Sequence, residues 1–507
     1  MTQPDNTRSN ALDALRGYAI MTMVLSAMEA FKVLPRWMYH AQVPPPDHVF
    51  NPSIYGITWV DLIFPFFLFS MGAAIPLSMH KQCAHGATPH QLHDKVAVRF
   101  VKLTFFAIFC IHMYPFMMGY TSPVLCSLVP ILAFLLMFVL FMRNPFHLSR
   151  KLDRLVTGAA YVVAIVWLVF QPYAGGVSFS VRTADVIMLI LAQVALTGTL
   201  LYQYTMHKPV VRAAVIPFIM ALFMSGHVKG SWQLYLLDHF TDHLSWLFYL
   251  RYQEYLIIII IGTLAGDLLL ARANHARPQA VPEPGTDQAP SAVSSEERCG
   301  KVRSLLTAAL SLVIIVGNVV GLYNRWLVPN LIFTVVATGA LIYLLRIHSK
   351  PQAQEGRADD AGSLIPASLS ERSLWLRLAQ LGGYCLLLGL VLEAYEGGIR
   401  KDDVTLSYLF VTAGLAVLAL LFFSVVSDHW HVRWLSVPLE LTGRNPMVAY
   451  VAGSMFVIPV LTLLHLWPFF DQMAAHPLSG FVRGIILTAL TVMVTIFTTK
   501  RKWYWKT

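Results

Sequence analysis

Long apolar stretches separated by short polar segments run through the whole chain. About fourteen of them are long enough to cross a membrane, since a helix of about 20 apolar residues spans a hydrocarbon core about 30 Å thick. They lie near 17–35, 57–79, 98–118, 124–142, 155–173, 184–205, 209–227, 252–271, 304–323, 327–346, 374–395, 404–426, 446–465 and 479–499. The pattern predicts an all-α fold, a polytopic integral membrane bundle of about 10–14 transmembrane helices, fourteen by this count.

Composition agrees with this class. The 507 residues are 56% hydrophobic and only 13% charged, whereas a soluble protein carries about 25% charged residues. The net charge of +10 does not indicate nucleic-acid binding, because membrane proteins concentrate Lys and Arg in cytoplasmic loops. Membrane lipid is therefore an expected partner and nucleic acid is not.

The basic residues also predict an orientation. They gather in the segments 143–154, 272–303 and 347–372 and in the terminal "KRKWYWKT", while the segments 119–123, 174–183 and 466–478 are nearly free of them. With an even number of spans, the positive-inside rule places the N- and C-termini in the cytoplasm.

Two polar linkers divide the chain. Segments 272–303 and 347–372 are rich in Pro, Ala, Ser and charged residues and are predicted to be flexible. They separate an N-terminal transmembrane helix group (1–271, with a candidate catalytic loop at 36–57), a helix pair (304–346) and a C-terminal helix group (373–507). Gly262 and Gly266 have the GxxxG spacing that permits close helix packing.

Candidate chemistry begins where the first two apolar stretches meet polar residues. Asp13 and Arg16 are three residues apart and would share a helix face, and Asp61 opens the second stretch. The loop between the stretches holds His40 and His48, whose side chains can exchange protons near neutral pH. The alternative is a helix-end ion pair beside a solvated loop.

Further along, the aromatic segment 228–251 is predicted to lie at the membrane interface. His239 and His243 in it have i, i+4 spacing, but no third ligand is evident, and we predict no metal site. Glu254 lies at the edge of a strongly apolar stretch. Asn445, followed by Pro446, fits the N-cap and first position of a helix.

Several blocks together carry a family resemblance. In order, they are "LDALRG", a histidine-bearing loop, "GITWVDLIFPFFLFSMG", the Glu254 segment leading to "GTLAG", "IRKDDVTLSY", "GRNPM" and "KRKWYWK". This set resembles the transmembrane acetyltransferases related to heparan-α-glucosaminide N-acetyltransferase, and most of all the bacterial NagX-like branch. The resemblance implies a location in the bacterial inner (cytoplasmic) membrane.

The resemblance also implies a reaction. Members of the family pass acetyl from cytoplasmic acetyl-CoA to the amine of a glucosamine unit on the far side, with a histidine of the first outer loop as acetyl carrier or base. In this chain His48 lies nearer than His40 to Gly56, which opens the "GITWVDL" block, and we therefore rank His48 first.

The residue types suit such chemistry. A histidine can accept a proton from an amine or carry acetyl covalently, and Asp47 or Asp61 can orient its ring. Outer-face residues are expected at the acceptor and its oxyanion: Asn51, Trp232, Glu254, Lys401, Ser407 and Tyr408. Residues of the opposite end are expected at acetyl-CoA, with Arg16 first: Asp13, Arg16, Arg99, Lys102, Arg444 and Asn445.

Two other functions remain open at this point. The same polar groups can form the sugar site of an amino-sugar or N-acetylglucosamine transporter, although we find no matching pair of interrupted helices in the two halves. An O-acyltransferase acting on envelope glycans or lipids is the third possibility. A helix face of small residues also permits a homodimer.

Overall fold

A computed structural model describes residues 9–30, 32–142, 144–239, 244, 246–275, 295–347, 366 and 368–505. Within these ranges the protein is helical and contains no strand. The helices are α1 (Asn10–Met28), α2 (Trp59–Ala84), α3 (Pro89–His112), α4 (Pro123–Phe141), α5 (Arg150–Phe170), α6 (Val186–Thr205), α7 (Pro209–Gly226), α8 (Trp232–His239), α9 (Leu256–His275), α10 (Ser295–Tyr323), α11 (Leu327–Arg346), α12 (Glu371–Tyr395), α13 (Leu406–Phe423), α14 (Arg433–Gly443), α15 (Pro446–Ala452), α16 (Ile458–Leu463), α17 (Trp467–Met473) and α18 (Pro477–Lys500).

These helices confirm the expected class. Among the described residues, 13 helices are long and apolar enough to cross a membrane, and each overlaps a predicted stretch. The remaining stretch, 98–118, overlaps α3, which carries Asp94, Lys95, Arg99 and Lys102 and is therefore less apolar. The chain is a multi-pass helical membrane protein.

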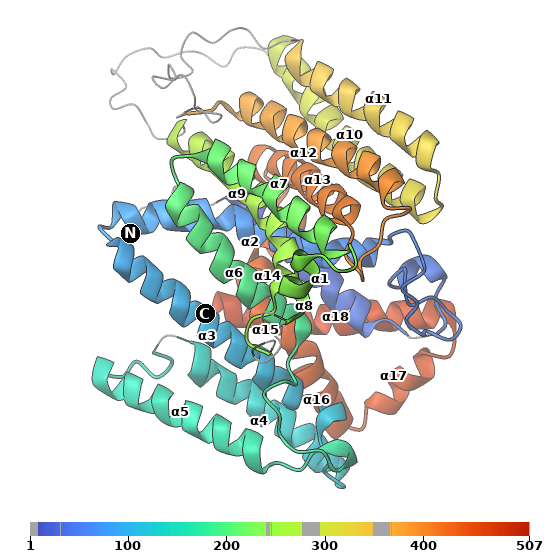
Figure 1. Ribbon diagram of the computed structural model, residues 1–507. Helices are drawn as coiled ribbons and strands as arrows, with labels where there is room; N and C mark the ends of the chain where they lie inside the picture. Colours follow the sequence, from blue (N-terminus) through green and yellow to red (C-terminus); the bar gives the residue numbers. More distant parts are fainter. Residues whose placement is uncertain are drawn as a thin grey trace.

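Most of the long helices lie side by side across the molecule (Figure 1). Helices α10 and α11 form one edge, α4 and α5 form the opposite edge, and α2, α9 and α13 lie between them. The N- and C-terminal ends of the chain lie on one side. We refer to this side as the Asp13 end and to the opposite side, where α2 begins, as the Asp61 end.

Helices α2 and α9 pack closely because glycines face backbone. A Cβ on Gly262 would lie 2.6 Å from the carbonyl oxygen of Phe69, and one on Gly266 would lie 2.4 Å from that of Ala73. These distances are shorter than any real Cβ contact, so only glycine fits. The GxxxG prediction is confirmed, and α2 is held against α9 along its middle.

The first helix begins earlier than predicted. It covers Asn10–Met28 rather than 17–35, because Ser9 caps it by accepting a hydrogen bond from the Leu12 N–H. Asp13 thus lies in the first turn and is buried, and does not precede the helix.

The predicted linkers are shorter than expected. Helix α9 extends to His275, α10 begins at Ser295, and α12 begins at Glu371. The rest of segments 272–303 and 347–372 lies largely outside the described residues.

Candidate functional site

The N-terminus of α2 fixes a buried carboxylate. Asp61 is fully buried, and its Oδ2 accepts hydrogen bonds from the Thr58 N–H (2.9 Å) and the Ala41 N–H (3.2 Å). The Thr58 hydroxyl in turn donates to the carbonyl of Tyr39 at 2.8 Å. These contacts tie the loop before α2 to the helix start and leave Asp61 Oδ1 for other partners.

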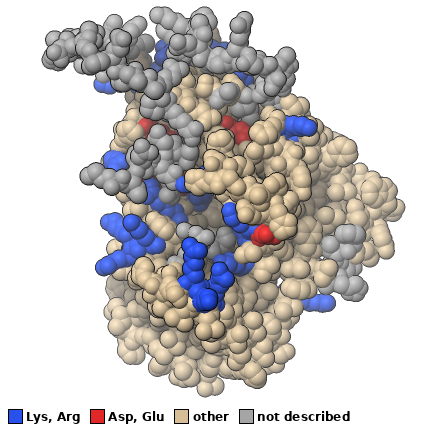
Figure 2. All heavy atoms as spheres, turned by 90° about the vertical axis from the view of Figure 1, so that its left-hand side faces the viewer, with Lys and Arg blue, Asp and Glu red and all other residues tan. Residues whose placement is uncertain are grey.

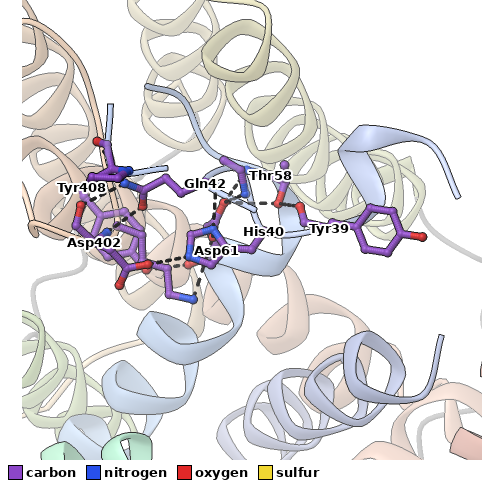
Figure 3. A network of polar contacts seen from close by, with 10 residues as sticks. Tyr39, His40, Gln42, Thr58, Asp61, Asp402 and Tyr408 are labelled. Atoms are coloured by element: carbon purple, nitrogen blue, oxygen red, sulfur yellow. Dashed lines mark hydrogen bonds and ion pairs between the residues drawn. The ribbon is translucent and has the colours of Figure 1, made fainter. Parts of the chain in front are cut away.

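His40 lies between two carboxylates (Figure 3). Its Nδ1 is 3.0 Å from Oδ1 of Asp61, and its Nε2 is 2.8 Å from Oδ2 of Asp402. The Nζ of Lys401 lies 3.9 Å from the same Asp61 oxygen. Nδ1 also accepts a hydrogen bond from the Gln42 N–H at 3.1 Å in the neutral ring. This N–H and the two carboxylates orient the ring, and the carboxylates stabilise it when it is protonated.

Asp402 reaches His40 from the segment between α12 and α13. The Asp402 N–H donates to Oε1 of Gln42 (2.8 Å), and Nε2 of Gln42 donates to the Asp402 carbonyl (3.0 Å). The hydrogen bond with His40, aided by Lys401, lowers the pKa of the Asp402 carboxyl despite partial burial. The Asp402 side chain is 43% exposed, whereas Asp61 is sealed, so the Asp402 side of His40 is the one open to an incoming molecule.

Tyr408, fully buried on α13, holds the start of α2. Its hydroxyl donates to the backbone carbonyl of Asp61 at 2.7 Å. Pro65 stands four residues after Asp61 and has no N–H, so it cannot make the helical bond to that carbonyl. The tyrosine therefore replaces a helix hydrogen bond that the sequence of α2 removes.

His48, ranked first from the sequence, lies elsewhere. Its ring packs edge-on against Tyr39 with centroids 4.7 Å apart, and burial, with Lys32 nearby, lowers its pKa. Its neighbour Asp47 is exposed. The side chain of Asn51 is also exposed and accepts a hydrogen bond from the Ser53 N–H at 2.9 Å. Asp61 and Asp402 are thus partners of His40.

The other outer-face candidates are dispersed. Ser407 is fully buried and donates to the Thr405 hydroxyl at 2.9 Å, so it completes a helix start. Glu254 lies in the short helical segment Leu250–Tyr255 before α9, and Trp232 is exposed at the start of α8. His243 lies outside the described residues. Within the described ranges, no group of three or more His, Cys, Asp or Glu side chains is placed to hold a metal ion.

A large cavity of about 940 Å³ opens near the Asp13 end. Figure 2 views this end and shows Lys and Arg gathered around a hollow. The basic side chains in the cavity wall are Arg16 of α1 and Lys95, Arg99 and Lys102 of α3. Apolar side chains of α2, including Phe67 and Met71, form another part of the wall.

The cavity brings together three of the residues expected at acetyl-CoA, namely Arg16, Arg99 and Lys102. Arg16 is also held by Asp13 (3.5 Å) and donates to the Ser70 carbonyl at 3.3 Å. Sequence reasoning missed Lys95, although positions 95, 99 and 102 share one helix face by their spacing. Asp402 and Gln42 could not be found from a local sequence pattern, because their contact joins segments that are distant in the sequence.

Three expected cofactor residues have structural partners instead and do not line the cavity. Nε of Arg444 lies 3.5 Å from Asp13, and its Nη2 lies 3.6 Å from Glu440. Gly443 makes this possible, since a Cβ there would lie 2.1 Å from the Asp13 carbonyl oxygen. Asn445 occupies the predicted N-cap position before Pro446, but its side chain makes no cap hydrogen bond.

Helix α2 connects the two regions. Asp61 lies at its first turn, and Phe67 in the cavity wall follows six residues later, about 9 Å along the axis at about 1.5 Å per residue. A basic cavity and a carboxylate-flanked histidine therefore approach each other along one helix.

The sequence matches a family model, described as a domain of unknown function (DUF5009), over residues 8–269, more than half of the chain. The chain belongs to the DUF5009 family. No curated protein matches it. The DUF5009 match covers α1 to most of α9 and so includes His40, Asp61, Arg16 and Arg99. Asp402, Lys401 and Tyr408 come from beyond it, so the site joins the DUF5009 region to the later helices.

Proposed function

We propose that this protein is a membrane-embedded acetyltransferase that moves acetyl from acetyl-CoA to the amine of an amino sugar of the glucosamine type. The observation that carries the proposal is the position of His40 between Asp61 and Asp402. Acetylation of an amine needs a group that accepts the amine proton near neutral pH, and histidine is the side chain suited to this task.

The buried Asp61 and the more exposed Asp402 take different roles in this proposal. Asp61 is fixed by backbone N–H groups and holds Nδ1 of His40. Asp402 lies on the open side and can attract the ammonium group of the acceptor. In the resting site the Nε2–H of His40 donates to Asp402. When the acceptor's ammonium group takes its place at Asp402 and the ring proton lies on Nδ1, beside Asp61, Nε2 accepts the proton that leaves the amine nitrogen as the new amide bond forms.

Two routes balance chemically. In direct transfer, the amine nitrogen attacks the thioester carbonyl, the carbon–sulfur bond breaks, and the proton taken up by His40 passes to the departing thiolate. In the carrier route, Nε2 of His40, with the ring proton on Nδ1, first takes the acetyl group and the thiolate leaves. The amine then attacks the acetyl-imidazolium, the bond between the carbonyl carbon and Nε2 breaks, and the amine proton passes to Asp402. Lys401, whose Nζ lies 3.9 Å from Oδ1 of Asp61, is the cation beside His40, and we assign to it the stabilisation of negative charge that develops on the carbonyl oxygen.

The basic cavity supports the choice of donor. Acetyl-CoA carries several phosphate charges, and guanidinium and ammonium groups are the side chains that bind phosphate. Arg16, Lys95, Arg99 and Lys102 supply them from two helices. We propose that the Asp13 end faces the cytoplasm of a bacterial inner membrane, in keeping with the distribution of Lys and Arg, and that the acceptor binds at the Asp61 end.

The test uses the full chain purified in detergent, with radiolabelled acetyl-CoA and glucosamine. Wild type is compared with His40→Ala and His48→Ala. We expect labelled N-acetylglucosamine from wild type and His48→Ala, and a loss on the order of 100-fold or more in His40→Ala. Trapping of label on the protein before glucosamine is added would select the carrier route.

Other outcomes point elsewhere. Full activity in His40→Ala would exclude the histidine mechanism. Absence of acetyl transfer by wild type, together with uptake of labelled sugar by proteoliposomes, would indicate that the protein is a transporter and not an enzyme. Label on a hydroxyl of an envelope glycan, with none on the amine, would indicate an O-acyltransferase.

A further inference from the structure

The segment after α18 folds back into the bundle. Trp505 is only 8% exposed, and its ring contacts the rings of four phenylalanines of α3 and α4. These are Phe106, Phe134, Phe138 and Phe141, with centroids 5.0 to 6.2 Å from that of Trp505. A backbone bridge joins Trp505 to Met142. This tryptophan is therefore a fixed part of the Asp13 end.

Asn445, just before α15, also holds the segment after α18. Its Nδ2 donates to the Trp503 carbonyl (2.9 Å) and to the Thr498 hydroxyl (3.3 Å), and its Oδ1 accepts from the Trp505 N–H (3.3 Å). The side chain that the sequence assigned to an N-cap is thus used to place Trp505 against the start of α15.

Trp505 also forms part of the wall of the basic cavity, together with Phe141 and Met142. The cavity accordingly combines four basic side chains on α1 and α3 with an aromatic wall. Basic groups alone would be enough for inorganic phosphate. An aromatic wall beside them suits a ligand that carries phosphates and a flat base, because bases stack on aromatic side chains.

We infer that Trp505 is a binding residue for the nucleotide base of the ligand in this cavity. The volume of about 940 Å³ is within the range of pockets for molecules of that size. The inference rests on the proposed function, because it names the part of acetyl-CoA that Trp505 contacts. It adds that recognition extends to the base and is not limited to the phosphates.

The experiment compares two ligands by calorimetry on the purified full chain: adenosine 3′,5′-bisphosphate and inorganic pyrophosphate. In Trp505→Leu, the nucleotide should bind at least about fivefold more weakly, while pyrophosphate binding stays within about twofold of wild type. Trp505→Phe keeps an aromatic face and should bind the nucleotide nearly as wild type. Arg99→Gln should weaken both ligands.

The matched control is Trp503→Leu. Trp503 lies on the same segment and contacts Phe138 and Phe497, but it does not line the cavity, so its loss should leave nucleotide binding unchanged. Thermal unfolding of each variant shows whether the protein is folded. Pyrophosphate too weak to detect, with nucleotide binding that still depends on Trp505, would also support a contribution from the base.

Equal weakening of both ligands in Trp505→Leu, or no weakening of the nucleotide, would overturn the inference. Acetyl transfer by wild type, together with nucleotide binding that does not depend on Trp505, would refute this inference but not the proposed acetyltransferase function. Nucleotide binding that depends on Trp505, without acetyl transfer to any amine, would refute the proposed function alone. Failure of wild type to bind the nucleotide would also refute the inference, while the acetyl-transfer assay decides the proposed function separately.

Discussion

Nε2 of His40 lies 2.8 Å from Oδ2 of Asp402, across 362 residues of sequence. This contact joins the loop before α2 to the segment before α13, and it lies on the open side of the histidine. Asp402→Asn keeps the size of the side chain but removes its charge. We expect acetyl transfer to fall on the order of 100-fold, because the histidine loses a partner that stabilises its protonated form.

The neighbouring carboxylate provides the control. Asp403 is exposed, and Asp403→Asn should transfer acetyl at close to the wild-type rate. Binding of coenzyme A, measured by calorimetry, should be unchanged in both variants, since the basic cavity is separate from these residues. Equal loss of activity in the two variants would instead indicate a general effect of negative charge on acceptor binding.

The hydrogen bond between Tyr408 and the Asp61 carbonyl predicts that substitutions at Tyr408 and Pro65 have coupled effects on stability. Tyr408→Phe leaves a buried carbonyl without its donor and should lower the free energy of unfolding by about 1–3 kcal/mol. In a Pro65→Ala background the backbone N–H of residue 65 is available to that carbonyl, so Tyr408→Phe should cost clearly less. Thermal unfolding of the four proteins of this double-mutant cycle measures the difference, and additive effects would contradict it.

Glu29 gives a dependence of stability on pH. It ends α1 at the Asp61 end, is 6% exposed, and lies against Gly484 of α18, with Tyr39 and Arg483 nearby. Burial raises its pKa to about 8. The folded protein therefore retains a proton that the unfolded chain releases above about pH 4.5, near the ordinary value for glutamate.

The direction of the pH dependence follows from this difference in pKa between the folded and unfolded states. The contribution of Glu29 to stability should be greatest below about pH 4.5 and should fall by about 1.4 kcal/mol per pH unit up to about pH 8, where Glu29 ionises in the folded state as well. Glu29→Gln should remove this part of the slope in melting temperature against pH. Asp47→Asn changes an exposed carboxylate at the same end and should leave the slope of melting temperature against pH unchanged. An unchanged slope in Glu29→Gln would exclude Glu29 as its cause.

The close packing of α2 on α9 predicts a large effect from one methyl group. A Cβ at Gly262 meets the Phe69 carbonyl oxygen at 2.6 Å, so Gly262→Ala should destabilise the protein by about 1–3 kcal/mol. Gly339 of α11 has no heavy atom within 4 Å of such a Cβ, and Gly339→Ala should be neutral or stabilising. Equal melting temperatures for the two variants would contradict the packing argument.

The apolar pattern predicted the helices well because each span depends on its own residues. It placed α1 too late, because the helix starts at the Ser9 cap and includes the polar residues Asp13 and Arg16, and the burial of Asp13 depends on Arg444 and Gly443, which are more than 400 residues away. The ranking of His48 above His40 used spacing along the loop, whereas the proposed role of His40 rests on its contacts with Asp61 and Asp402, of which Asp402 is distant in the sequence. Lys95, Arg99 and Lys102 form a stripe within one helix, and such local patterns can be found from sequence alone.

The short stretch of α2 between Asp61 and Phe67 has a consequence for permeability. If the two substrates bind as proposed, a plug of about two helical turns, rich in phenylalanine, is all that divides the compartments there. Only a two-carbon group has to pass this plug, so catalysis across the bilayer needs no rocking of one half of the protein against the other. Such an enzyme can remain sealed to ions and sugars throughout its cycle.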